Sequence, residues 1–242
     1  MKTTLQLALI ASLLATTVAL RAADEAGFKP LFDGQSLAGW DGKPEFFSVK
    51  DGAIHAETTV ANPLKKNTFL IYTNGVFADF ELRFDYKVVG GNSGMQYRSE
   101  RQPDYVMKGY QSDFENTNRF TGMFFEENGR MFMGQPGEFV TVKPLTDEAK
   151  AKDPKARALL DKTVFATKAD VFSHIADATA WHSMTIIARG NTFVHIVDGR
   201  VMSVAVDEDA ANFKKSGLIG LQVHSGPPMT IDLKNVRIRE IK

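Results

Sequence analysis

Residues 80–88 read Phe80-Glu81-Leu82-Arg83-Phe84-Asp85-Tyr86-Lys87-Val88, an unbroken alternation of apolar and polar side chains. Successive side chains of a strand point to opposite faces, so this period of two is typical of a sheet with one apolar face. We therefore predict that the fold is built on a β-sheet that buries one of its sides.

Further strand patterns lie on both sides of this segment. Residues Phe47–Ala56 and Phe193–Val201 each read as strand, Asp-Gly turn and strand, and Asp-Gly suits the positive φ angles of tight hairpins. Leu218–His224 and Ile231–Ile241 are two more apolar strand candidates near the end of the chain. Short strands at hairpin spacing with few helices predict an all-β fold, an antiparallel sandwich.

The stretch 143–180 departs from this pattern. It is rich in Lys, Asp and Ala and lacks a period of two, and we expect a helical or loop excursion at one edge of the sandwich. Short helices are expected over Thr146–Ala151, Lys155–Lys162 and Lys168–Ile175, the first two separated by Asp153-Pro154. Such excursions serve as lids or binding loops, or are solvated surface inserts.

The N-terminus has the pattern of a secretory signal peptide. Met1-Lys2 gives a short positive start, and the apolar run Leu5–Leu20 precedes small residues that suit cleavage. We expect residues 1–22 to be a signal peptide rather than a buried helix, and residues 23–242 to form one domain. A periplasmic or secreted protein follows from this, and the absence of cysteine excludes disulfides and thiolate chemistry.

The charge balance limits the classes of partner. The chain has 29 Lys and Arg against 29 Asp and Glu, and no long basic run. This composition argues against a nucleic-acid partner or an acidic membrane surface, and we expect no membrane span.

Two segments, 90–98 and 109–114, place an unusual set of polar side chains on predicted strands. By alternation, one face would carry Gln96, Arg98 and Glu100 from the first strand and Gln111, Asp113 and Glu115 from the second. The opposite face would send Met95, Tyr97, Tyr110 and Phe114 into a core. A sheet face with this density of amides, carboxylates and a guanidinium suits a polyhydroxylated ligand.

Blocks with a characteristic order run along the chain: Leu31–Trp40, Asp79–Arg83, Gly91–Gly94, Arg98, Gly109-Tyr110, Thr121-Gly122, Trp181-His182, Ile219–His224 and Val236–Ile238. Through these blocks the chain resembles the 3-keto-disaccharide hydrolase family, from about Phe28 to Lys242. The more specific parts are Asn92-Ser93-Gly94 with Arg98, and Gly220-Leu221-Gln222-x-His224.

The resemblance implies a concanavalin-like jelly-roll sandwich whose concave face holds the site. Family members act on small glycosides oxidised to a ketone at sugar C3. The ketone acidifies the C2 proton, so a base can form an enolate and expel the C1 aglycone, and hydration completes a net hydrolysis. This chemistry requires a base near C2, donors at the enolate oxygen and an acid near the glycosidic oxygen.

Three residues are the catalytic candidates. Arg98 is a permanent cation suited to an enolate oxygen, or else a structural partner of nearby carboxylates. His224 suits a base or acid role, although a lone strand histidine is often structural. Asp113 is the other candidate base, and its alternative is a solvated or salt-bridged carboxylate.

Substrate binding is expected from five residues, Asn92, Gln96, Tyr110, Gln111 and Gln222. One of these positions departs from the family: many members carry Gly-Tyr-Glu-x-Gln where this chain reads Gly109-Tyr110-Gln111-Ser112-Asp113. The acid and the amide have exchanged places, which leaves the identity of the base open.

A divalent cation is a further possibility, with Asp113, Glu115 and His224 as ligands, although no linear zinc or EF-hand motif occurs. Glu126-Glu127 is interpreted as a solvated pair at a loop edge. Two other functions stay open: a carbohydrate-binding module, and an endo-glucanase with a carboxylate pair. The second is disfavoured because its usual Glu-x-Asp-x-x-Glu triplet is absent.

Overall fold

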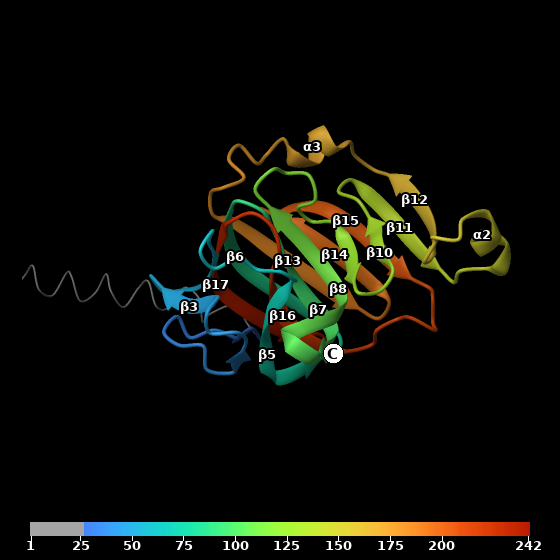
Figure 1. Ribbon diagram of the computed structural model, residues 1–242. Helices are drawn as coiled ribbons and strands as arrows, with labels where there is room; N and C mark the ends of the chain where they lie inside the picture. The colour runs from blue at the N-terminus through green and yellow to red at the C-terminus, as the bar shows by residue number, and fades with distance from the viewer. Residues whose placement is uncertain (1–26) are drawn as a thin grey trace, which may run out of the picture.

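The computed structural model describes residues 27–242, which fold into two β-sheets packed face to face with short helices at the periphery (Figure 1). The larger sheet has ten strands, and β1 (Lys29–Pro30) pairs with its β17. The remaining strands lie in the spatial order β12 (Leu159–Val164), β11 (Glu138–Lys143), β15 (Arg200–Asp207), β14 (Thr192–Val197), β13 (His182–Arg189), β6 (Phe80–Val89), β17 (Met229–Glu240), β4 (Ala53–Thr58) and β3 (Phe47–Lys50).

The second sheet has seven strands and lies in front of the first in Figure 1. Its spatial order is β10 (Met131–Gly134), β9 (Phe124–Glu127), β8 (Val106–Glu115), β7 (Asn92–Gln102), β16 (Gly217–Val223), β5 (Thr68–Phe77) and β2 (Trp40–Asp41). In Figure 1, β7 and β8 are green. A short 3-10 helix, η1 (Pro103–Tyr105), forms the tip between β7 and β8.

The predicted all-β sandwich is confirmed. The alternating segment at Phe80 is β6, and both Asp-Gly segments form hairpins, β3–β4 and β14–β15. The pairing is antiparallel throughout except between β11 and β15, which run parallel. That pair joins the excursion to the edge of the large sheet.

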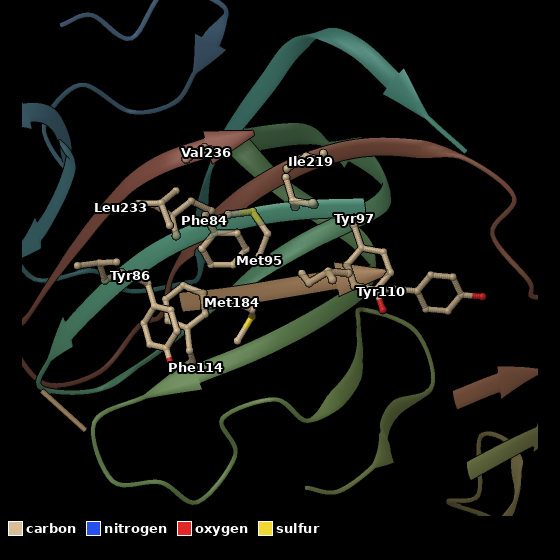
Figure 2. Packing of buried hydrophobic residues seen from close by; sticks show 14 of the residues in the cluster. Phe84, Tyr86, Met95, Tyr97, Tyr110, Phe114, Met184, Ile219, Leu233 and Val236 are labelled. Carbon is tan, nitrogen blue, oxygen red and sulfur yellow. The ribbon is translucent and has the colours of Figure 1, made fainter. Parts of the chain in front are cut away.

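The core lies between the two sheets (Figure 2). β6 contributes Phe84 and Tyr86, and β7 and β8 contribute Met95, Tyr97 and Phe114, all at 1% exposure or less. Each such side chain stabilises the fold by roughly 1.5–3 kcal/mol through its removal from water. The apolar face predicted from alternation in β6 is therefore the face that packs against the second sheet.

The excursion, residues 143–180, contains less helix than predicted. Helices α2 (Asp147–Lys152) and α3 (Lys168–Phe172) form, but the helix expected over Lys155–Lys162 is wrong. Leu159–Val164 is instead strand β12, paired with β11. β12 is an edge strand with mostly exposed side chains, so its sequence carries no alternation of apolar and polar residues.

The proposed signal peptide, residues 1–22, lies outside the described residues. In the part of the chain that the structure describes, no helix has the length and apolar character needed to cross a membrane.

Candidate functional site

The outer face of the seven-stranded sheet carries polar side chains, whereas its inner face carries the core. Gln96 lies opposite Gln111 across β7 and β8, and both are buried. A cavity of about 230 Å³ opens on this face. Its walls come from β7, β8, β9, β10, β16 and the loop after β8: Asn92, Gln111, Asp113, Phe120, Phe125, Glu127, Phe132, Gln222 and His224.

Asp113 is the buried acid of this pocket, with only 5% of its surface exposed. Burial, with a smaller contribution from the carboxylates of Glu127 and Glu115, raises the pKa of Asp113 to about 7. Hydrogen bonds from the Gln111 amide (2.7 Å) and the Asn92 amide (3.5 Å) partly offset this effect. A carboxyl with a pKa near neutrality is suited to accept a proton from carbon-bound hydrogen acidified by a ketone.

A chain of amides holds this carboxyl in place. The Gln96 Nε2 donates to Gln111 Oε1 at 2.9 Å, and the Gln111 Nε2 donates to Asp113 Oδ1 and, at 3.4 Å, to Gln222 Oε1. Gly94 permits this arrangement, because a Cβ at that position would lie 2.5 Å from the Gln111 side-chain carbon Cδ. Gln96 is fully buried behind Gln111 and supports the site without lining it.

The motif Asn92-Ser93-Gly94 is thereby explained residue by residue. Asn92 lines the pocket, the Ser93 hydroxyl donates to the Gln222 carbonyl at 2.7 Å, and Gly94 makes room for Gln111. The exchange of acid and amide relative to the family keeps both groups in the pocket, since Gln111 and Asp113 share one strand face.

Glu127 is a pocket residue that the sequence interpretation missed. The Glu126-Glu127 segment is part of β9 and is not a solvated pair: Glu126 is buried on the core side against Arg130, whereas Glu127 faces the pocket. Burial raises the pKa of Glu127, while hydrogen bonds from Asn67 and Gln222 and the charge of His224 oppose the shift.

His224 follows the end of β16 and lines the mouth of the pocket. Its Nδ1 lies 2.6 Å from the Ser225 carbonyl oxygen. A carbonyl only accepts, so Nδ1 carries the proton and Nε2 is left as the acceptor of the neutral ring. Burial raises the pKa of the neighbouring Glu127 carboxyl, and the charge of His224 opposes that rise. The imidazole can act as an acid or a base through Nε2.

Three aromatic rings form the apolar wall of the pocket. Phe125 and Phe132 meet edge to face with their centroids 5.1 Å apart, and Phe120 lies 6.2 Å from Phe132. Phe132 is 53% exposed and therefore available to a ligand. An apolar wall facing a few converging polar groups is the usual composition of a small-molecule site.

Arg98 does not belong to this pocket, so the prediction that it shares a face with Gln96 is wrong. A β-bulge between Tyr97 and Glu100 interrupts the alternation, and Arg98 has a positive φ of 45°. Its guanidinium is buried and donates to the Ala78, Gly190 and Lys214 carbonyls and to Asp79. With its donors engaged there, Arg98 ties loops together and is not placed to contact a ligand in the pocket.

Tyr110 is a predicted ligand contact, but it likewise lies on the core side, as Figure 2 shows, and does not line the pocket. Its hydroxyl donates to Asp207 Oδ2 at 2.5 Å and accepts from the Lys214 backbone N–H at 3.1 Å. The alternation of β8 puts Tyr110 on the face opposite Gln111, which is the physical reason for this placement.

The predicted cation ligands are not brought together. The Glu115 carboxylate accepts from Thr117 Oγ1 and from the backbone N–H groups of Arg119 and Phe120, which fixes the loop after β8. Among residues 27–242 there is no group of three or more His, Asp or Glu side chains arranged to hold a metal ion. The residues present therefore do not form the cation site proposed from Asp113, Glu115 and His224.

Comparisons with solved structures find chains of similar fold. A candidate glycosyl hydrolase from Parabacteroides distasonis is 17% identical, with a TM-score of 0.56, and the match covers 88% of this chain and 99% of that one. The carbohydrate-binding module CBM66 from Bacillus subtilis is 15% identical, with a TM-score of 0.51 and coverage of 84% and 96%. A Bacillus licheniformis β-glucanase is 10% identical, with a TM-score of 0.51 and coverage of 90% and 100%.

At these identities the likeness concerns the fold, and no curated protein matches the chain. The family model of the 3-keto-alpha-glucoside-1,2-lyase-like domain, however, matches residues 27–239, nearly the whole described chain. The protein belongs to the 3-keto-alpha-glucoside-1,2-lyase-like family.

Proposed function

We propose that this protein cleaves small 3-keto-glycosides by elimination followed by hydration, a net hydrolysis. The observation that carries the proposal is the Asp113 carboxyl, buried in a polar pocket with its pKa raised to about 7. The family assignment supplies the substrate class, an oxidised sugar.

In the proposed first step, Asp113 removes the proton from C2, and the electron pair forms an enolate with the C3 ketone oxygen. The enolate then collapses: the C3 carbonyl reforms, a C1–C2 double bond forms, and the C1–oxygen bond to the aglycone breaks. His224, which lines the pocket, is the group placed to deliver a proton to the leaving oxygen.

Water then adds at C1 and gives one proton to His224, which replaces the proton lost to the aglycone, while C2 takes up a proton; this regenerates a free 3-keto sugar. Asp113, whose carboxyl proton exchanges with solvent water between the two steps, is the group placed to protonate C2, so the base ends the cycle in its starting state. The amides of Asn92, Gln111 and Gln222 are the neutral groups that read the ring hydroxyls and orient C2 toward Asp113.

Arg98 has no part in this scheme, since its donors are engaged elsewhere. Of the residues that line the pocket, His224 is the one able to bear positive charge. It therefore also stabilises the negative charge that develops on the substrate during elimination. We further propose a periplasmic or secreted location, on the signal-peptide pattern of residues 1–22.

The test is aglycone release from an aryl 3-keto-glucoside and from its unoxidised parent, measured with wild-type protein, Asp113→Asn and the matched surface variant Asp161→Asn. Asp161 is 68% exposed and remote from the pocket lining. We expect release from the keto compound alone, a loss of about 10²–10⁴-fold in Asp113→Asn, and no change in Asp161→Asn. Equal cleavage of both glycosides would contradict the mechanism.

A second candidate, a carbohydrate-binding module, is favoured by the aromatic wall of Phe120, Phe125 and Phe132. In that case the protein would bind the keto-glucoside by calorimetry without releasing the aglycone, and Asp113→Asn would change only the affinity.

A further inference from the structure

A second hollow, of about 310 Å³, lies on the outer face of the ten-stranded sheet. β6, β17 and the β3–β4 hairpin form its base, because the residues that alternate with the core side chains of these strands point to this face. The Asp113 pocket opens on the outer face of the other sheet, so the two hollows lie on opposite sides of the sandwich. The walls of the second hollow carry lysines, aspartates and a tryptophan: Lys50, Lys87, Lys234, Asp51, Asp232 and Trp181.

The register of the sheet brings these side chains together. Asp232 of β17 lies opposite Lys87 of β6. Lys234 is the next residue of β17 on the same face. Ala53 lies opposite Lys50 in the β3–β4 hairpin, and its single methyl group leaves the depression between the longer side chains.

Trp181 forms the aromatic side of this hollow and is held at a fixed point. The next residue, His182, is buried, with Nδ1 2.6 Å from Asp198 Oδ2 and Nε2 2.8 Å from the Asp177 carbonyl oxygen. The Lys234 ammonium lies 3.9 Å from the centroid of the Trp181 ring, a cation–π contact. Trp181 is nevertheless 40% exposed, so part of the indole is open to a ligand. The apolar C–H face of a sugar ring can pack on such a preorganised ring.

The charges of the hollow indicate the class of ligand. Within residues 27–242, Lys50 and Lys87 form no ion pair, so their ammonium groups can bind an anionic group. Asp232 Oδ1 lies 2.6 Å from His55 Nδ1, and the Asp232 side chain is still 26% exposed; Asp51 is exposed at the hairpin turn. Ammonium donors beside carboxylate acceptors suit a polyol with one acidic group, because the carboxylates accept from ring hydroxyls. The same carboxylates would repel a ligand with several anionic groups, such as a nucleoside diphosphate.

We propose that this hollow is a second binding site, separate from the Asp113 pocket, for a uronic acid unit of a glycan. The sugar ring packs on Trp181, its carboxylate pairs with the lysines, and its hydroxyls donate to Asp51 and Asp232. The volume of about 310 Å³ is at the lower end of the roughly 300–1,000 Å³ of small-molecule pockets, which leaves room for one ring with the rest of the glycan in solvent. A glycan bound here leaves the Asp113 pocket free, since the two hollows open on opposite faces.

The test is a titration of the wild-type protein with two disaccharides of the same linkage. One carries glucuronic acid joined to glucose, and its neutral match carries two glucose units. The chain has two tryptophans and Trp40 is buried, so a change in tryptophan fluorescence on binding reports Trp181, with calorimetry as the second readout. We expect the acidic disaccharide to bind about tenfold more tightly than the neutral one, because the lysines attract its carboxylate.

Substitutions in the hollow should separate the role of the ring from that of the charges. Trp181→Ala should lower the affinity for the acidic disaccharide about tenfold, and Trp181→Phe, which keeps a ring, should lower it less. The double variant Lys50→Gln with Lys87→Gln should remove most of the preference for the acidic disaccharide. The matched controls Phe165→Ala, 46% exposed, and Lys152→Gln, with a side chain 75% exposed, line neither hollow and should bind as wild type does. Thermal unfolding confirms that each variant is folded.

The outcomes distinguish this site from the lyase activity. Absence of binding by the wild type, or equal binding of the two disaccharides, would overturn the proposal, and so would an unchanged affinity in Trp181→Ala. Neither disaccharide carries a ketone, and Trp181→Ala should release the aglycone from a 3-keto-glucoside at the wild-type rate. Absence of aglycone release with disaccharide binding intact would refute the proposed function and support the second site.

Discussion

Replacing Asp113 with asparagine should lower activity by about 10²–10⁴-fold and, above neutral pH, stabilise the fold. A carboxyl whose pKa is raised on folding binds its proton more tightly in the folded state, so its ionisation costs stability as pH rises from its unfolded pKa to its folded pKa. For Asp113 these limits are the ordinary carboxyl pKa of 3.8 and a folded-state pKa of about 7.

The magnitude follows from the part of this window that an experiment can sample. From pH 5 to the folded-state pKa of about 7 the pH rises by two units. At about 1.4 kcal/mol per unit, the unfolding free energy of the wild type should fall by up to about 3 kcal/mol over this interval, and that of Asp113→Asn should not. The asparagine oxygen can still accept the hydrogen bond from Gln111, so the local network survives at Oδ1. For a chain of this size, 1 kcal/mol shifts the melting temperature by about 2–4 °C.

The assay is urea unfolding of wild type, Asp113→Asn and the surface control Asp161→Asn at pH 5 and pH 8. The difference in unfolding free energy between Asp113→Asn and wild type should increase by up to about 3 kcal/mol from pH 5 to pH 8 and reach its plateau near pH 8. Asp161→Asn should show no such increase. A difference independent of pH would refute the argument that burial raises this pKa.

Three further substitutions separate the pocket from the framework. Arg98→Lys should lower the unfolding free energy by about 2–4 kcal/mol in urea titrations, because the buried guanidinium donates hydrogen bonds to four loop groups. The kcat per folded molecule should be unchanged. A large loss of kcat with normal stability would show that Arg98 acts in the site. Tyr110→Phe should cost about 1–2 kcal/mol, because the Asp207 carboxylate loses a donor, and KM should be unaffected; an increase in KM would show ligand contact. Glu127→Gln removes a carboxylate that raises the pKa of Asp113, so the rising limb of the kcat/KM pH profile should move to lower pH; a shift to higher pH would contradict this coupling.

The sequence was sufficient for the sandwich because alternation and Asp-Gly turns are local signals. The same signal put Gln111 and Asp113 on one face, and both line the pocket. The alternation signal failed at Arg98, because a bulge adds a residue to the strand there and no local sequence pattern predicts that bulge. It also failed at Leu159–Val164, an exposed edge strand.

Glu127 could have been found from the sequence. Phe125 and Glu127 are two residues apart, so a strand through Phe124–Glu127 sends both to the same side, and the pairing of Gln111 with Phe125 makes that the pocket side. What the sequence could not supply is that pairing, which joins strands across a turn and a loop.

The most direct test of the central claim is hydrogen exchange at C2. Turnover of a 3-keto-glucoside in D₂O should give a free 3-keto sugar with deuterium at C2 from the first turnover, since elimination removes that hydrogen and hydration replaces it from Asp113 or solvent. A reaction without enzyme, sampled at the same times, corrects for spontaneous exchange. A product that keeps its original C2 hydrogen would contradict elimination and show direct hydrolysis at C1.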